Sequence, residues 1–236
     1  MFETREGILK HCSRKNAEKL GELGQRFINR RQPSLEAQVA NIGDQIAYNN
    51  HDLDDGLRAG LISIEQLRHV ELFNDKFEYV NTKYPKLNER RKIYECIRSI
   101  INELVTDLVI QSKSAIEDKA PDTIEDVRIE TKPLIQFSEK MRLKNVELKT
   151  FLNKNLYQHY KVHRMSQKAK KIVLDLYSSF YNDINLMPDE YRSYAESAQA
   201  KKGDSGRARI VADYIAGMTD RYAIAEHERI FNAKII

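Results

Sequence analysis

The sequence predicts an all-α protein, and three observations support that fold class. The chain carries 9 glycines and 5 prolines in 236 residues, and the segment between Gly60 and Gly203 runs for 142 residues without a glycine. Tight hairpin turns depend on residues that tolerate a positive φ, chiefly glycine and asparagine, so this distribution argues against a many-stranded sandwich or barrel. In several segments apolar residues also recur at spacings of three and four, the period of a helix with one buried face.

The composition is that of a globular chain that can bury a core, with 41% apolar and 31% charged residues. A net charge of +4 suits an anionic small molecule better than it suits a dedicated DNA-binding domain. Cys12 and Cys96 lie far apart without a CxxC pair, which predicts reduced thiols. No segment approaches the roughly 18 apolar residues of a membrane span, and the first residues lack the apolar run of a signal peptide. We therefore expect a cytoplasmic protein without a membrane partner.

The first strong helix is expected to begin at Ser34, after weaker helical segments over residues 3–14 and 16–30. Ser34 is the candidate N-cap, because its hydroxyl can accept a hydrogen bond from a free N–H of the first turn. Spacings of four, three and four predict one buried stripe, formed by Leu35, Val39, Ile42 and Ile46. The run Asp54-Asp55-Gly56 predicts a break or bend, with short helices over residues 57–69.

The longest helix is expected between Pro85 and Pro121. Its apolar residues repeat at four, four, three and four, and they are Ile93, Ile97, Ile101, Leu104 and Leu108. Asp122, with Glu125 three positions later, predicts a start similar to a capping box for the next helix. Further helices are expected near residues 133–160 and 164–183, and a loop over 201–206 precedes a last helix with the stripe Val211, Ile215, Met218 and Tyr222. No segment of the sequence indicates a boundary between two domains, so residues 1–236 are expected to form a single helical unit.

One helix face carries a candidate site formed by Asp44, Tyr48 and Asp52. Residues four apart are offset by only about 40° around a helix, so the three form one slanted stripe, opposite the expected apolar stripe. The stripe could simply face water. However, the side chains within about 60° of Asp44 are small, namely Ala37, Ala40 and Ala47, whereas a solvated face is more typically long and charged. Small neighbours allow a ligand or another backbone to approach, and a buried carboxylate then needs a metal or a positive partner.

The same segment resembles a known family. SLEAQVANIGDQIAYNNHDLDDGLRAGL, residues 34–61, is similar to a segment of the bacterial deoxyguanosinetriphosphate triphosphohydrolase-like proteins, dNTPases of the HD-domain superfamily. VADYIAGMTDRYA, residues 211–223, resembles that family's C-terminal signature, and residues 148–159 and 186–191 resemble intervening segments in the right order. The resemblance covers nearly the whole chain. It implies the C-terminal half of such a protein, with residues 1–60 as the end of the HD core and 61–236 as a C-terminal helical region.

The resemblance implies metal-assisted release of triphosphate from a deoxynucleoside triphosphate. The family holds a divalent cation, such as Mg²⁺ or Mn²⁺, with an H…HD…D pattern, and Asp44 matches the last aspartate. By the same resemblance Tyr48 packs against sugar or phosphate, and Asp52 accepts a hydrogen bond from the sugar 3′-hydroxyl. The H…HD part would precede residue 1, so no catalytic residue is expected here. The chain is expected to be a fragment or truncated product that is inactive alone. Its expected partners are dNTPs and either further copies of itself or a separate N-terminal half.

Other residues are candidate substrate or subunit contacts, each with a structural alternative. They are Arg91, Asp213, Tyr214, Asp220, Arg221 and Tyr222. A solvated basic turn explains Arg91 without any ligand. Asp213 and Asp220 are expected to share a face of the last helix, where a structural ion-pair network explains them as well as a ligand contact does.

Three further motifs carry less information. The pair His51-Asp52 spells HD but lies after the last expected ligand, and we interpret it as coincidence. His159 and His163 lack a third ligand, which favours structural or surface roles. A basic face formed by Arg164, Lys168, Lys170 and Lys171 suits single-stranded nucleic acid or an effector nucleotide, although solvation alone also explains it. The alternative function is therefore a non-catalytic helical module that binds nucleotide or nucleic acid, or that completes a partner subunit.

Overall fold

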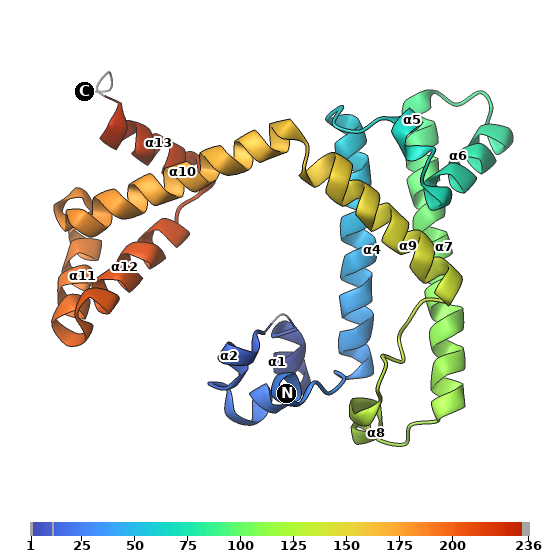
Figure 1. Ribbon diagram of the computed structural model, residues 1–236, viewed down its shortest axis with the longest axis horizontal. Coiled ribbons are helices and arrows are strands. Elements are labelled where there is room, and N and C mark those ends of the chain that lie inside the picture. The colour runs from blue at the N-terminus through green and yellow to red at the C-terminus, as the bar shows by residue number, and fades with distance from the viewer. Residues whose placement is uncertain (1, 11, 233–236) are drawn as a thin grey trace. The chain divides into compact units, whose positions relative to one another are not determined.

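The computed structural model describes residues 2–10 and 12–232, and within them every regular element is helical (Figure 1). The all-α prediction is confirmed. Where a single helical unit was expected, the chain divides into two compact units, one up to His159 and one from Tyr160 onward. No helix within the described residues is long and apolar enough to cross a bilayer.

The first unit opens with short helices: α1 (Phe2–Ile8), α2 (Arg14–Ala17), a 3₁₀ turn (Gly21–Gly24) and α3 (Gln25–Asn29). Gly24 is required here, because a Cβ at this position would overlap the carbonyl oxygen of Ala17. Glu6 of α1 is 1% exposed, and its carboxylate lies 2.8 Å from Nε of Arg26 and 3.6 Å from a guanidinium nitrogen of Arg128. A buried carboxylate between two arginines thus joins three helices of the unit, α1, α3 and α8 (Ile124–Ile129).

Helix α4 (Leu35–Arg58) carries the candidate site and starts where the sequence predicts, with Ser34 Oγ accepting from the N–H of Ala37 at 3.3 Å. The break predicted at Asp54-Asp55-Gly56 is wrong, because the helix continues to Arg58. The glycine has a packing role instead. A Cβ on Gly56 would lie 2.9 Å from Cδ1 of Ile62 and 3.2 Å from Leu156. Val39, expected in the buried stripe, is 51% exposed.

The core of the first unit forms where α4, α6 (Glu71–Lys83), α7 (Glu89–Lys119) and α9 (Glu139–Leu152) pack together (Figure 1). Helix α7 confirms the long helix predicted between the two prolines. The most deeply buried side chains are apolar, and they include Leu53, Phe73, Ile100, Leu104 and Leu148. Cys96 is among the buried residues, and burial raises the pKa of its thiol to about 12, so it is a poor nucleophile.

Two short helices and a π-helical turn complete the first unit. Helix α5 (Ile64–Leu67) has a capping box formed by Ser63 and Gln66, and α8 has one formed by Thr123 and Asp126. The predicted cap of α8, Asp122 with Glu125, is therefore one residue too early. After α9 the chain makes a π-helical turn over Asn153–Tyr157.

The second unit packs α10 (Tyr160–Asn182) against α12 (Asp204–Ala216) and α13 (Asp220–Phe231), with α11 (Asp189–Lys202) against α12 and a 3₁₀ turn over Ile184–Leu186. Its buried core comprises Ile172, Leu176, Phe180, Met187, Val211 and Tyr214. Gly206 lets α12 approach α11, because a Cβ there would overlap the carbonyl oxygen of Ala198. The single last helix predicted by the sequence is wrong: α12 ends before Gly217, and Thr219 caps α13 by accepting from the N–H of Tyr222 at 3.3 Å.

Candidate functional site

Asp44, Tyr48 and Asp52 lie on the outward face of α4, one helical turn apart. The side chain of Asp44 is 53% exposed and Tyr48 is 68% exposed, while Asp52 is half-buried. Buried amides on a neighbouring face of α4 fix the helix. Gln38 accepts from the N–H groups of Leu134 and Ile135 at 2.9 and 3.1 Å, and the Asn49 side chain donates to Asn145 at 3.1 Å. The sequence thus places three ligand-type side chains along about 12 Å of a rigid helix surface.

Asp44 is paired with Lys10, whose ammonium donates a hydrogen bond to the carboxylate. Lys10 follows α1, so the pair joins the N-terminal short helices to α4. Within the described part of the chain no three His, Cys, Asp or Glu side chains gather to hold a metal ion. A hard divalent cation takes six or more oxygen ligands, of which Asp44 supplies at most two. The residues present therefore do not by themselves form the metal site that the family resemblance implies.

Asp52 accepts a hydrogen bond from the phenol of Tyr157, at the end of the π-helical turn after α9. Partial burial and the negative charge of Asp52 raise the pKa of Tyr157 to about 12. The phenol stays protonated at neutral pH and remains a donor. One carboxylate oxygen of Asp52 therefore already accepts a hydrogen bond from the protein.

The further contact candidates are scattered. Arg91 is exposed in the first turn of α7, in the first unit, whereas the other five lie in the second unit. Tyr214 is 6% exposed and packs its ring on Tyr191 at 4.5 Å and on Phe180 at 5.3 Å. Burial raises its pKa. This ring is thus part of the hydrophobic core.

The shared face predicted for Asp213 and Asp220 is wrong, because Asp213 belongs to α12 and Asp220 to α13. Because the helix is interrupted over residues 217–219, Asp220 does not have the angular position relative to Asp213 that a continuous helix would give it. Asp213 instead accepts from Nε of Arg209 on its own helix at 2.8 Å. Arg221 and Tyr222 are exposed in the first turn of α13.

The basic face of α10 lies on the exposed first half of that helix. Arg164, Lys168 and Lys170 are exposed, and Lys171 pairs with Asp175 at 3.1 Å. The guanidinium of Arg164 stacks over the ring of Tyr160 at 5.1 Å. No acidic residue occurs between Tyr160 and Leu174, so this segment has a positive surface that suits an anionic polymer.

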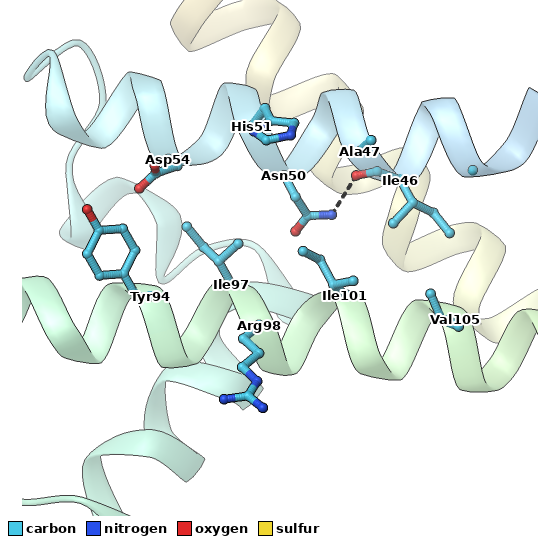
Figure 2. A pocket seen from close by; sticks show the side chains of 11 residues that line it. Ile46, Ala47, Asn50, His51, Asp54, Tyr94, Ile97, Arg98, Ile101 and Val105 are labelled. Atoms are coloured by element: carbon cyan, nitrogen blue, oxygen red, sulfur yellow. Dashed lines mark hydrogen bonds between the residues drawn. The ribbon is translucent and has the colours of Figure 1, made fainter.

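Sequence reasoning missed a cavity of about 540 Å³ between α4 and α7 (Figure 2). His51, the histidine of the coincidental HD pair, lies at the edge of this cavity. Asn50 lies inside it, 3% exposed. Its position could have given a signal, because Asn50 falls within about 40° of the buried Ile46 on the helical wheel and is therefore a polar residue on an apolar face.

Comparisons with known proteins agree with the resemblance drawn from the sequence. Residues 135–229 match the family model described as a phosphohydrolase-associated domain. The chain is 53% identical over 98% of its length to the "Deoxyguanosinetriphosphate triphosphohydrolase-like protein" of Thiobacillus denitrificans and covers 59% of that protein. It is 51% identical over 98% of its length to the protein of the same name from Bordetella pertussis, and 50% identical over its full length to that of Ralstonia nicotianae, covering 58% of each. The chain thus spans just under three fifths of the length of the relatives it matches.

Proposed function

The chain is a homologue of the deoxyguanosinetriphosphate triphosphohydrolase-like proteins over nearly its whole length, and from this premise we propose that it supplies the C-terminal part of a metal-dependent dNTP triphosphohydrolase. The overall reaction converts a dNTP and water to a deoxynucleoside and inorganic triphosphate. The observation that carries this proposal is the stripe on α4. Asp44, Tyr48 and Asp52 stand on one exposed face at the spacing of consecutive helical turns, so a single extended ligand can touch all three.

Each residue of the stripe has a role set by its chemistry. Asp44 is the carboxylate that we assign to a divalent cation, and the cation needs further ligands, because no three His, Cys, Asp or Glu side chains gather for it within the described residues. In the absence of a cation Lys10 neutralises Asp44. Tyr48 presents an exposed ring against which a sugar can pack, and Asp52 accepts from a sugar hydroxyl while Tyr157 holds its other side. The chain alone is inactive in this proposal.

Reconstitution tests this proposal directly. The purified chain is assayed for triphosphate release from dGTP with Mn²⁺, alone and after mixing with the remaining N-terminal segment of the Thiobacillus denitrificans relative. We expect no release from the chain alone and release from the mixture. Asp44→Asn should abolish the restored activity, while Glu36→Gln, an exposed carboxylate in the first turn of the same helix, should leave it intact. Triphosphate release by the chain alone, or an active Asp44→Asn mixture, would refute the proposal.

The basic first half of α10 favours a second candidate function, a helical module that binds single-stranded nucleic acid. Binding carried by phosphate contacts weakens steeply with salt. Fluorescence anisotropy with a labelled oligothymidylate should show such binding, and the double variant Lys168→Glu, Lys170→Glu should remove it. Salt-independent anisotropy, or an unaffected double variant, contradicts this function. Light scattering on the same samples tests whether the chain self-associates, as expected for a homo-oligomer.

A further inference from the structure

A slot between α4 and α7 is separate from the stripe of Asp44, Tyr48 and Asp52, although it lies on the same helix. Its volume is about 540 Å³. Ile46 of α4 and Ile97 and Ile101 of α7 form apolar walls, and Val105 closes one end (Figure 2). Tyr94 stands at the opposite end, facing Asp54 of α4. A slot with aliphatic walls and an aromatic ring at its end suits a flat, largely apolar ligand.

The amide of Asn50 presents an unpaired acceptor to this slot. Its Nδ2 donates to the carbonyl oxygen of Ile46 at 2.7 Å, which fixes the orientation of the amide because an acceptor must face a donor. Oδ1 then points toward α7 (Figure 2). This oxygen is buried, and no described residue donates a hydrogen bond to it. A buried acceptor without a donor is costly, so the slot favours an occupant that supplies an N–H or O–H group.

The polar groups around the slot restrict the ligand further. Asp54 adds a second acceptor on α4, four residues after Asn50. The guanidinium of Arg98, which also borders the slot, points away from α4 (Figure 2). The hydroxyl of Tyr94 accepts from Nε of Arg90 at 3.2 Å. Two acceptors and no arginine directed inward disfavour an anionic group in the slot and favour a neutral ring with N–H donors.

We propose that the α4–α7 slot binds a nucleobase, with a ring N–H or exocyclic amine donating to Oδ1 of Asn50 and the ring held between Ile46, Ile97 and Ile101. The base is that of a nucleoside or a nucleotide, because the slot itself recognises neither the sugar nor the phosphates. The proposal requires an N–H group on the base, because Oδ1 of Asn50 can only accept a hydrogen bond. A base whose only N–H is blocked by methylation lacks the group that Asn50 needs, although its shape and stacking surface are nearly unchanged.

Ligand-detected NMR on the 236-residue chain tests the slot without metal or triphosphate, so its failure leaves the proposed hydrolase function untouched. The probes are thymidine, whose base has a single N–H, and N3-methylthymidine, which has none. Thymidine should bind saturably, and N3-methylthymidine should bind at least about tenfold more weakly because Oδ1 stays unpaired. Thymidine monophosphate tests whether the phosphate contributes to binding. An affinity equal to that of thymidine supports recognition of the base alone, whereas binding that requires the phosphate overturns the proposal.

Three variants locate the binding. Ile101→Phe fills the slot from α7, at a position that is 37% exposed and so tolerates a larger side chain. Asn50→Leu keeps the volume and removes the acceptor. Both should weaken thymidine binding at least about tenfold. Leu143→Phe is the matched control, because Leu143 is 55% exposed on α9 and lies outside the slot.

Two further outcomes overturn the proposal. One is the absence of saturable thymidine binding. The other is thymidine binding that Ile101→Phe leaves unchanged. Circular dichroism of each variant shows whether it folds, and Ile101→Phe decides the question even if Asn50→Leu does not fold.

Discussion

The phenol of Tyr157 donates a hydrogen bond to the carboxylate of Asp52 across 105 residues of sequence. The contact ties the π-helical turn after α9 to the C-terminal third of α4, beside the exposed Tyr48. A candidate ligand-binding carboxylate is therefore held in place by a group from a distant segment. The energetic value of this contact is open to measurement.

Tyr157→Phe should lower the free energy of unfolding by about 0.5–1.5 kcal/mol, the usual net value of a hydrogen bond. The effect depends on pH. Because the folded-state pKa of about 12 lies above the ordinary value of 10, the stabilisation is complete below about pH 10 and is lost as pH rises through 12. Urea unfolding of both proteins at neutral and strongly alkaline pH checks this. A difference in stability that persists above pH 12 would show that the hydroxyl acts in another way.

Glu6→Gln should destabilise the first unit by about 3–5 kcal/mol, because it leaves the buried guanidinium of Arg26 without its countercharge and removes one of the two carboxylates near Arg128. Burial already lowers the pKa of Arg26 against the opposing pull of Glu6. The matched control is Glu125→Gln. Its carboxylate pairs with Arg128 at 2.6 Å but is 56% exposed, so it should cost no more than about 1 kcal/mol. Thermal denaturation of the two variants measures the contrast, and equal losses would contradict it.

Two glycine-to-alanine substitutions should shift stability in opposite directions. Gly206→Ala places a Cβ against the carbonyl oxygen of Ala198, where backbone must move, so a loss of about 1–3 kcal/mol is expected. Gly43→Ala on α4 meets nothing within 4 Å and should stabilise by roughly 0.5–1 kcal/mol through helix propensity. Denaturant midpoints give both signs in one experiment. A stabilised Gly206→Ala protein would refute the close packing of α11 and α12.

Asp175→Asn should loosen α13 in the second unit. Nε2 of His227 lies 2.9 Å from this carboxylate and Lys171 lies 3.1 Å from it, and the hydrogen bond with His227 is the main cause that lowers the pKa of Asp175. A lowered carboxyl pKa means that the stabilisation is present above about pH 4, the ordinary value, and is lost as pH falls further. Amide exchange along residues 220–231 should therefore be faster in the variant at pH 7. No difference between the proteins is expected after acidification below the lowered pKa of the wild-type carboxyl.

Local patterns predicted the parts of the fold that depend on neighbouring residues. The apolar period of Ile93 to Leu108, bracketed by prolines, gave α7, and the Pro33-Ser34 pair gave the start of α4. Gly56 was misjudged because the reason for that glycine, the approach of Ile62 and Leu156, comes from other elements. At Gly217 the error went the other way. The apolar period from Val211 to Tyr222 predicted one continuous helix, whereas Thr219 caps a new helix and the chain breaks before it.

In the candidate site, too, local sequence predicted what depends on one helix and missed what depends on distant segments. The spacing of Asp44, Tyr48 and Asp52 suffices to place them on one face, because the geometry of one helix determines it. Their partners Lys10 and Tyr157 lie 34 and 105 residues away, at positions that helix periodicity does not relate to α4. Asn50 was overlooked because it belongs to a polar run, Asn49-Asn50-His51, which suggests a solvent-exposed position. Only its angular position beside Ile46 on the helix indicates that it is buried.

The boundary between the compact units after His159 bears on how fragments of this chain should be cut. The phosphohydrolase-associated match begins at residue 135, inside the first unit, and therefore includes α9. Leu148 and Leu152 of that helix are 0% and 1% exposed within the first unit's core. A fragment cut at 135 would carry these two leucines into solvent, at a cost of about 1.5–3 kcal/mol for each. A fragment that begins at Tyr160 avoids that exposure and keeps the whole core formed by Phe180, Val211 and Tyr214.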